Sequence, residues 1–308
     1  MEDRARAEEQ FREIMRSLCA HRKSEARPYD AIMAYSGGKD SSYTLKVLKD
    51  RFDLKILAVT FDHGFLSPQA VRNIRAVTGA LDVDHWMVTP GPGALKRAFV
   101  RSLGLHRYPM KALERASSVC NTCMHLVKSL VIKTAIEVGI PAIAYGWSPG
   151  QVPLRSAIMK TNLAMLRSMQ DAVRSQLSDI MGDDLAPYLL QERHYRSAQE
   201  FLKAYDGHFL YAVYPLAFLP YDEDAILDTI APLGWKAPAD TDSNSTNCLL
   251  NAFANQAHIE AYGFHPYAFE VAGLVRGGHM TRDAGIEKIS KPSDPRIIEE
   301  VKRRLGIG

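Results

Sequence analysis

The chain has 308 residues, of which 46% are hydrophobic and 24% are charged, and its formal net charge is +3. This composition is that of a folded globular protein and excludes a disordered chain, a collagen-like chain and a small disulfide scaffold. The charge is too weak to indicate nucleic-acid binding by itself. The length is typical of two domains, or of one large α/β domain with an added region.

Cysteine use and hydropathy indicate the compartment. Four cysteines, Cys19, Cys120, Cys123 and Cys248, do not make a disulfide framework in a chain of this length. The first residues are charged and helical in pattern, unlike a signal peptide, and no apolar run approaches the ~18 residues that cross a bilayer. We therefore expect a cytoplasmic protein with reduced thiols and no membrane attachment.

Strands and helices alternate through the first half of the chain, after an amphipathic helix over 3–20. Apolar runs predict strands at 31–35, 54–61, 83–88 and 142–145. Helices are predicted between them, at 40–48, 67–78, 96–103 and 119–138. Alternation at this spacing predicts an α/β fold, a doubly wound parallel sheet with helices on both faces.

The pattern changes after residue 150. A helix is predicted over 156–180, followed by further helices, few strands, and a loop over 233–247 that is rich in Gly, Pro, Asp, Ser and Asn. We expect an N-terminal helix in 1–26 and an α/β domain in 27–180. The remainder, 181–308, is expected to be a mostly helical C-terminal region that contributes Cys248.

The most informative stretch is the loop over 36–42, Ser-Gly-Gly-Lys-Asp-Ser-Ser, which follows the first strand and begins a helix. Its glycines let the backbone approach a ligand, and a helix start presents free N–H groups to an anion. Ser36, Ser41 and Ser42 add hydroxyl donors, and Lys39 adds a positive charge. The spacing differs from that of the Walker A loop and of the dinucleotide-binding loop. The alternative to an anion site is a plain strand-to-helix turn.

The segment AYSGGKDSSYTLKVL resembles the SGGxDS signature of the PP-loop ATP pyrophosphatases, the adenine nucleotide alpha-hydrolase-like superfamily, at all six positions. The resemblance implies a Rossmann-like ATP-binding domain over 27–180. It implies that ATP is cleaved between its α and β phosphates, that AMP is placed on a substrate oxygen, and that nitrogen or sulfur then displaces AMP. Lys39 stands at the variable position, where lysine is common among sulfur-transfer members. Pyrophosphate would be held by Ser36, Gly37, Gly38, Asp40 and Ser41.

A carboxylate beside phosphates is costly unless it binds Mg²⁺ or orients a donor, so Asp40 implies Mg²⁺. Lys39, Asp40 and Asp62 are the candidate catalytic residues. Asp62 and His63 follow the second strand and could bind metal or polarise the reacting centre, or form only a satisfied loop pair.

Ligands in doubly wound sheets lie beyond the carboxyl ends of the strands, so Ser36, Asp62 and Gly146 should line one crevice. The resemblance implies that Thr60 and Phe61 contact adenine through their backbone and that Gly146 lies against the nucleotide. His63 belongs to the same candidate nucleotide site.

Cys120 and Cys123 form a Cys-x-x-Cys pair at the start of the helix over 119–138. Two thiols on one helical turn can share a metal, and the helix dipole favours their thiolate forms. Four interpretations remain: a redox dithiol, a zinc site completed by Cys248 with His125 or another group, inert cysteines, and an iron–sulfur cluster.

Cys248 follows the loop over 233–247 and is expected to open another helix, as Cys120 does. Cys-x-x-Cys plus one distant cysteine resembles the arrangement in PP-loop tRNA-thiolation enzymes and in some sulfurtransferases that modify small molecules. The resemblance implies that Cys120, Cys123 and Cys248 hold a [4Fe-4S] cluster whose fourth iron is open to an extra sulfide. Zn²⁺ is the alternative, and Cys19 is not expected to be a ligand.

The acceptor is left open. Zinc-ribbon pairs and an RNA-binding domain are not evident, and residues 146–151 read GWSPGQ where many thiolation enzymes have a glycine–histidine motif with paired aspartates, which weakens tRNA as the acceptor. The stretch from Lys96 to Arg115 contains seven Lys, Arg or His residues, His106 among them, and one acidic residue, Glu114. This stretch could guide a phosphate-bearing substrate or RNA, or be a solvated surface.

Segments from the second half, such as YPLAFLPYDEDAILDTIAPLGWKAPADTDSNSTNC and LVRGGHMTRDAGIEKISKP, resemble PP-loop N-acetyl sugar amidotransferases, which take ammonia from a partner glutaminase. The expected function is ATP-dependent adenylation followed by sulfur transfer. The alternatives are an amidotransferase of the sugar-amidine kind and a non-catalytic nucleotide-binding sensor. Expected partners are a small-molecule or nucleotide-containing acceptor and a sulfur-donor protein or glutaminase, and a homodimer is open.

Overall fold

A six-stranded sheet forms the centre of the fold in the computed structural model, which describes residues 2–24, 28–104, 107–177, 180, 183–204 and 209–307. His106 lies outside the described residues. The strand order is β3-β2-β1-β4-β6-β5, and every pair is parallel except β5 with β6. The bounds are β1 (Ala31–Ala34), β2 (Ile56–Phe61), β3 (Asp84–Val88), β4 (Ala142–Tyr145), β5 (Ile158–Lys160) and β6 (Tyr211–Val213). The prediction of a doubly wound α/β fold is confirmed.

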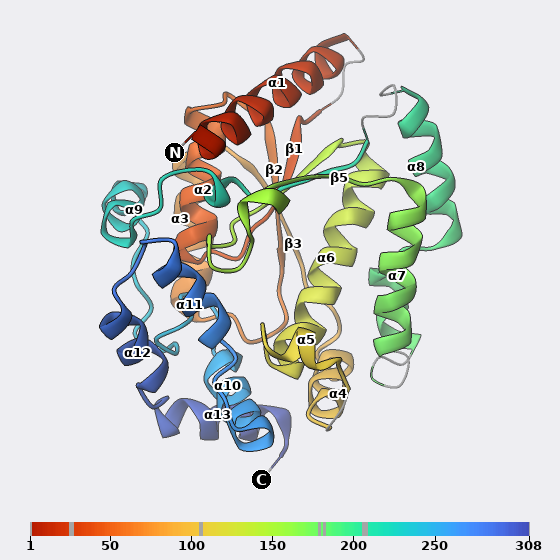
Figure 1. The fold of residues 1–308 in the computed structure, drawn as a ribbon. Coiled ribbons are helices and arrows are strands. Elements are labelled where there is room, and N and C mark those ends of the chain that lie inside the picture. The colour runs from red at the N-terminus through yellow and green to blue at the C-terminus, as the bar shows by residue number, and fades with distance from the viewer. Residues whose placement is uncertain are drawn as a thin grey trace.

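Helices cover both faces of the sheet. Figure 1 shows α2 (Lys39–Asp50) and α3 (Pro68–Ala80) on one side of the strands and α6 (Ser118–Val138) on the other. This division follows from right-handed crossovers, because the chain runs out from β1 to β3 and then returns across the sheet to β4. The remaining helices are α1 (Glu2–Ser24), α4 (Pro92–Ser102), α5 (Met110–Leu113), α7 (Leu163–Leu177), α8 (Glu192–Ala204), α9 (Glu223–Ile230), α10 (Leu250–Tyr262), α11 (Ala268–Arg276), α12 (Arg282–Ser290) and α13 (Pro295–Leu305).

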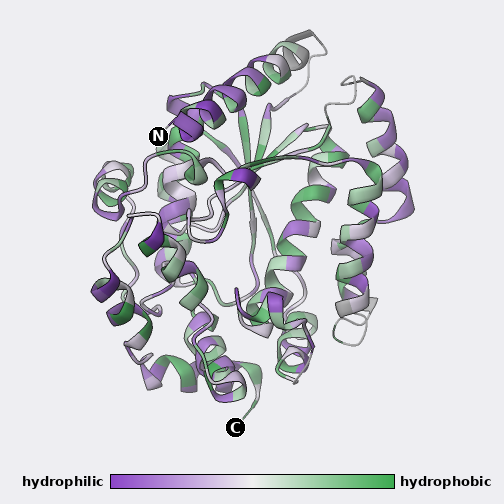
Figure 2. Cartoon of the chain, viewed as in Figure 1, coloured by the Kyte–Doolittle hydropathy of each residue, from purple (hydrophilic) through white to green (hydrophobic). Residues whose placement is uncertain are grey.

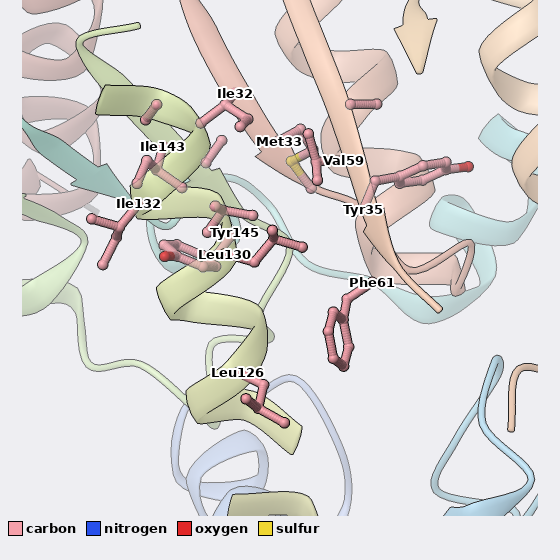
Figure 3. Packing of buried hydrophobic residues seen from close by; sticks show 14 of the residues in the cluster. Ile32, Met33, Tyr35, Val59, Phe61, Leu126, Leu130, Ile132, Ile143 and Tyr145 are labelled. Carbon is pink, nitrogen blue, oxygen red and sulfur yellow. The ribbon is translucent and has the colours of Figure 1, made fainter. Parts of the chain in front are cut away.

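The central strands are hydrophobic along their whole length. Every residue of β2 and β4 is buried, as expected for strands covered on both faces, and Figure 2 shows hydrophobic colouring along much of the centre of the sheet. Helix α6 closes one face: its Leu126 and Leu130 lie in the core cluster with Phe61 at the end of β2 (Figure 3). None of the described helices is long and apolar enough to cross a membrane.

The structure departs from the sequence prediction after residue 150. The segment predicted as a helix over 156–180 begins with strand β5, and α7 starts only at Leu163. Strand β6 comes from the region predicted as mostly helical and pairs with β4, so the sheet crosses the boundary placed at residue 180. Strands of three residues are too short to show an alternating pattern, which is why the sequence did not reveal them. The C-terminal region from α9 to α13 is helical, as predicted.

Candidate nucleotide and thiol site

The loop after β1 is shaped by Gly37. Its φ is +74°, and a Cβ built there would lie 2.6 Å from Ile74 Cγ1 and 2.8 Å from the Ala70 carbonyl oxygen. Its own carbonyl accepts a hydrogen bond of 3.0 Å from the Trp235 indole. Glycine is therefore required here for both backbone conformation and space, which keeps the turn tight at the start of α2.

The serines of the loop divide into two groups. The Ser36 and Ser41 hydroxyls lie 3.1 Å apart and face the crevice described below. Helix α2 begins after Gly38 without a side-chain cap, which leaves its first turn suited to an anion. Ser42 is fully buried and its hydroxyl lies 3.1 Å from the Tyr35 hydroxyl. The structure thus brings Ser36 and Ser41 to the crevice and places Ser42 in the core.

Lys39 and Asp40 contact the C-terminal region. Lys39 Nζ donates to Asp40 Oδ1 at 2.9 Å and to the Tyr221 hydroxyl at 3.0 Å, and Tyr221 donates to the same Asp40 oxygen at 3.1 Å. Burial alone would lower the pKa of Lys39, but the charges of Asp40, Tyr221 and Glu223 outweigh it and raise the pKa. The Lys39 ammonium is therefore kept charged and is directed to Asp40 and Tyr221, not to the crevice lining.

The residues at the end of β2 and directly after it have different roles. The Thr60 hydroxyl donates to the Tyr35 carbonyl at 2.7 Å, while Phe61 lines the crevice. Asp62 Oδ1 accepts the Gly64 N–H at 2.9 Å, which supports the loop-pair interpretation for this carboxylate. His63 is buried in the crevice wall, and burial lowers its pKa to about 4, so its ring is neutral near pH 7.

The end of β4 touches the start of α2. A Cβ on Gly146 would lie 2.6 Å from Ser41 Cα, so only glycine lets the strand end approach this helix. Gly146 also lines the crevice, as predicted from its place in the sheet. The next residue, Trp147, packs with Tyr145 and Tyr214 at ring-centre distances of 5.7 and 5.3 Å and forms an aromatic wall.

Lys128 on α6 is a crevice residue that the sequence analysis missed. Its Nζ lies 4.5 Å from the centre of the Trp147 ring, and burial lowers its pKa to about 8. The sequence could have indicated this residue, because it is a lysine within the mostly apolar run from Leu126 to Val131. A helix face that packs on a sheet seldom carries a charged side chain without an ionic partner. Lys128 places a cation opposite the serine loop.

Glu270 on α11 was also missed. It accepts a hydrogen bond of 2.7 Å from the buried Ser148 hydroxyl, and burial raises its pKa to about 7. A Cβ on Gly150 would lie 2.3 Å from the Glu270 carbonyl oxygen, so α11 packs directly on the loop after β4. No local motif marks this residue, because its environment is made by two segments distant in sequence.

One crevice joins these features. Its wall contains two hydroxyls of the serine loop, the ends of β2 and β4, and the thiol-bearing face of α6. The lining residues are Ala34, Tyr35, Ser36, Ser41, Val59, Phe61, His63, Leu66, Cys123, Met124, Val127, Lys128, Tyr145, Gly146, Trp147 and Asn247. The serines of the loop over 36–42 and a cysteine thus face the same space.

The three candidate ligand cysteines come together from distant segments. Cys120 lies on the first turn of α6 and Cys123 on the second, and Cys248 pairs with Leu66 in an antiparallel bridge two residues before α10, so it precedes that helix and does not open it. A negative charge on Cys248 or on Cys120 would raise the pKa of the Cys123 thiol. Asn251, on the first turn of α10, lies with its amide 3.9 Å from Cys120 Sγ.

Burial dominates the acidity of these thiols. It raises the pKa of Cys123 well above the ordinary value, and it raises that of Cys248 to about 12 with help from the Cys120 charge. Burial therefore opposes the helix dipole, which the sequence analysis expected to favour the thiolate forms. A bound cation would favour the thiolates.

The spacing of the three thiols bears on which metal they could hold. No group of three or more Cys, His, Asp or Glu side chains within the described ranges is close enough to hold a metal ion. A tetrahedral zinc ion would hold thiolate sulfurs about 3.8 Å apart, so the arrangement gives no support to the zinc alternative. His125 packs against the Tyr108 ring at 5.7 Å. A multi-iron cluster is larger and takes more widely spaced thiolates, and the set of three mutually interacting thiols fits it in chemistry.

Comparisons with known proteins give a broad likeness. No family model matches the chain. A protein of Methanocaldococcus jannaschii named MJ1599, itself described as uncharacterized, is 26% identical over 303 residues, which cover 97% of this chain and 86% of that protein.

Three solved structures are similar at lower levels. The U34-tRNA thiolase NcsA from Methanococcus maripaludis with its [4Fe-4S] cluster is 15% identical, covers 96% of this chain and 80% of its own, and has a TM-score of 0.39. NMN synthetase from Francisella tularensis is 10% identical over 98% and 97% of the two chains, with a TM-score of 0.38. A predicted subunit of a tRNA methyltransferase from M. jannaschii is 17% identical over 77% and 91%, with a TM-score of 0.33. At these scores the likenesses do not bear on the reaction.

The fold and the site together define a class. The protein is a doubly wound α/β protein whose SGGKDS loop lies between β1 and α2, at the carboxyl edge of the sheet where such folds bind nucleotides. Within that class, the loop resembles the signature of the PP-loop ATP pyrophosphatases.

Proposed function

We propose that this chain is an ATP-dependent PP-loop enzyme that adenylates a substrate oxygen, releases pyrophosphate and replaces AMP with sulfur. The observation that carries the proposal is the crevice itself, which is lined at once by Ser36 and Ser41 of the anion loop and by Cys123. A nucleotide held at the loop and a sulfur delivered from the thiols would meet in one space, which is what the two-step reaction requires.

The first step belongs to the loop. A substrate oxygen attacks the α-phosphorus of ATP, and the bond to the β-phosphate oxygen breaks, so that pyrophosphate leaves. The amides at the start of α2 and the hydroxyls of Ser36 and Ser41 would stabilise the charge on that leaving group. Asp40, with Lys39 on one of its oxygens, would hold Mg²⁺, which neutralises phosphate charge when bound.

The second step belongs to the thiol side. A [4Fe-4S] cluster held by Cys120, Cys123 and Cys248 would supply the sulfur for transfer. The sulfur attacks the adenylated carbon, and AMP leaves with the substrate oxygen. Lys128 lines the same crevice, where its ammonium would stabilise negative charge on the acceptor or on the departing AMP.

The acceptor is a small molecule or a nucleotide-containing molecule, with tRNA the weaker candidate. Trp147 offers a flat surface on which a planar or sugar ring can pack, beside the Lys128 cation. A separate sulfur-donor protein would reload the site after each turnover.

An amidotransferase is the second candidate, and one observation favours it. The segment that resembles sugar amidotransferases includes Tyr221, Trp235 and Thr246, and all three contact the phosphate loop. The same adenylation would then be followed by attack of ammonia from a partner glutaminase. A nucleotide sensor without turnover is the third candidate.

The deciding experiment is anaerobic purification followed by iron, sulfide and zinc analysis, with pyrophosphate release measured for candidate acceptors in the presence of sulfide or ammonia. Iron and sulfide in a ratio near one, with sulfide-dependent turnover, support the proposal. Ammonia-dependent turnover without iron supports the amidotransferase. Absence of pyrophosphate release with every acceptor would refute both reactions and leave the sensor.

A further inference from the structure

Three consecutive residues connect the phosphate loop to the thiols. The Thr246 hydroxyl accepts the Lys39 N–H at 3.0 Å. Asn247 lines the crevice, and its Oδ1 lies 3.3 Å from the position a Cβ on Gly38 would take. Cys248, the next residue, carries the third thiol, which interacts electrostatically with Cys120. One end of this segment, Thr246, thus contacts the loop over 36–42, and the other end, Cys248, belongs to the thiol group.

The segment is held by backbone hydrogen bonds to the loop before α3. Ser67 N–H donates to the Asn247 carbonyl at 2.9 Å, and Leu249 N–H donates to the Phe65 carbonyl at 2.9 Å. The Cys248 N–H donates to the Ser245 hydroxyl at 3.1 Å. The Cα atoms of Thr246 and Cys248 are at most ~7 Å apart along the chain, so only two peptide units separate the residue at the loop from the thiol.

A phosphate at the loop must act on Thr246. The Lys39 N–H belongs to the first turn of α2, one of the donors that have no partner within a helix and that an anion normally takes. In this structure it is given to the Thr246 hydroxyl. An incoming phosphate oxygen either takes that N–H and displaces the hydroxyl, or accepts the hydrogen that the hydroxyl still has to donate. In the first case Thr246 loses a partner, and in the second it gains one, so the hydrogen bonding of Thr246 changes in either case.

We propose that Thr246 is a positioning residue that couples nucleotide binding at the phosphate loop to the state of the thiol site at Cys248. The inference rests on the proposed function, because it takes ATP as the ligand of the loop. Coupling of this kind is reciprocal: if nucleotide changes how Cys248 is held, modification of Cys248 changes nucleotide affinity. Couplings between two sites in one protein are typically 5–150-fold.

The test uses the full chain, reduced and metal-free, with α,β-methylene-ATP and Mg²⁺, since this analogue cannot be cleaved between its α and β phosphates. The rate at which iodoacetamide modifies each cysteine is followed by peptide mass spectrometry with and without the analogue. We expect saturating analogue to slow modification of Cys248 at least five-fold. Cys19, on α1 beside the loop between α2 and β2 and so at the opposite edge of the sheet, should be unaffected.

Variants separate coupling from a structural role. In Thr246→Val, which keeps the shape and removes the hydroxyl, the analogue should change the Cys248 rate less than two-fold although the variant is folded. Thr246→Ser, which restores the hydroxyl, should recover the full effect. Ser243→Ala, on the same loop but exposed, should behave as the wild type. Alkylation of Cys248 in the wild type should weaken the analogue at least five-fold, and much less in Thr246→Val.

Direct binding of the analogue, measured in the same samples, distinguishes the two proposals. If the wild type does not bind the analogue, the proposed function fails. If it binds and the Cys248 rate is unchanged, or is changed equally in wild type and Thr246→Val, the coupling through Thr246 is refuted while the proposed function stands.

Discussion

Lys39 of the phosphate loop and Tyr221 of the C-terminal region are 182 positions apart in the chain, and the lysine Nζ donates to the tyrosine hydroxyl at 3.0 Å. Trp235 and Thr246 make two more contacts of the same kind, to the Gly37 carbonyl and the Lys39 N–H. The loop over 36–42 is thus packed against side chains from the second half of the protein. It follows that the α/β part alone does not contain the whole site.

The first prediction concerns Asp40, whose Oδ1 receives both Lys39 and Tyr221. Asp40→Asn should reduce ATP-dependent pyrophosphate release at least a hundred-fold, because an amide neither holds Mg²⁺ well nor balances the Lys39 charge. The loss of a charge at the start of α2 should cost the fold only ~0.3–1 kcal/mol. Thermal unfolding and pyrophosphate release measure the two effects.

Asp50→Asn is the matched control, since Asp50 ends the same helix and pairs with Lys46 at the surface. It should leave pyrophosphate release unchanged. Full activity of Asp40→Asn would show that Asp40 only begins the helix.

The second prediction concerns Gly37. Gly37→Ala would place a Cβ against Ile74 and the Ala70 carbonyl and push the turn out of position. Affinity for an ATP analogue should fall at least ten-fold, which is about 1.4 kcal/mol. Calorimetry measures the affinity, and circular dichroism shows whether the variant is folded.

Gly278→Ala is the control for backbone strain. Gly278 has a similar φ of +71°, but a Cβ there would meet nothing within 4 Å. This variant should lose some stability and keep its affinity for the analogue. Equal loss of affinity in both variants would mean that Gly37 acts through general destabilisation and not through the loop.

The sequence predicted the features that are local in the chain. A buried strand followed by two glycines and three serines within seven residues was enough to place the loop over 36–42 between β1 and α2, because turn chemistry and helix starts depend on neighbouring residues. Ser36 and Gly146 could be brought to one crevice from the order of elements alone, whereas Asp62, predicted with them, is not among the residues that line it.

Features that depend on contacts between distant segments were not predictable. Lys39 was expected to add a positive charge to the loop, but its contact with Tyr221 could not be foreseen, because no local pattern connects the two residues. Strands β5 and β6 form because β4 offers an unpaired edge, not because their three residues favour extended structure. The effect of burial on the thiol pKa values could not be foreseen, because the helix dipole is visible in the sequence and burial is not.

The third prediction concerns the cysteines. Replacing Cys120, Cys123 or Cys248 by Ala should each abolish uptake of iron and sulfide on anaerobic reconstitution, because a cluster with an open iron needs all three thiolates. Cys19→Ala should take up iron as the wild type does. Iron, sulfide and absorbance near 400 nm are measured for all four variants, and retained iron in any of the first three would contradict the three-cysteine site.

The last prediction concerns Lys128, a largely buried cation whose Nζ contacts the Trp147 ring. Its pKa in the folded protein is about 8, below the usual value of 10.5, because burial penalises the charged form. Lys128→Met should therefore raise the free energy of unfolding near pH 7 by ~1–3 kcal/mol, since each unit of pKa shift corresponds to about 1.4 kcal/mol. The same variant should lose turnover, as expected for a residue kept for function at a cost in stability.

The stability difference between wild type and Lys128→Met should depend on pH. Below pH 8 the lysine is charged in both the folded and unfolded states, so the wild type carries the full penalty. As pH rises from 8 to about 10.5, the folded protein releases the proton first, and the difference in stability between wild type and Lys128→Met should narrow and then vanish. Lys133→Met is the control, because Lys133 lies on the same helix and pairs with Glu137 at 3.2 Å, and it should change stability by less than about 1 kcal/mol at any pH. Two results would contradict the prediction: a Lys128→Met variant that is less stable than the wild type at pH 7, or a difference in stability that does not change between pH 8 and 10.5. Either result would show that the charge of Lys128 is compensated in the crevice and is not free to act on the acceptor.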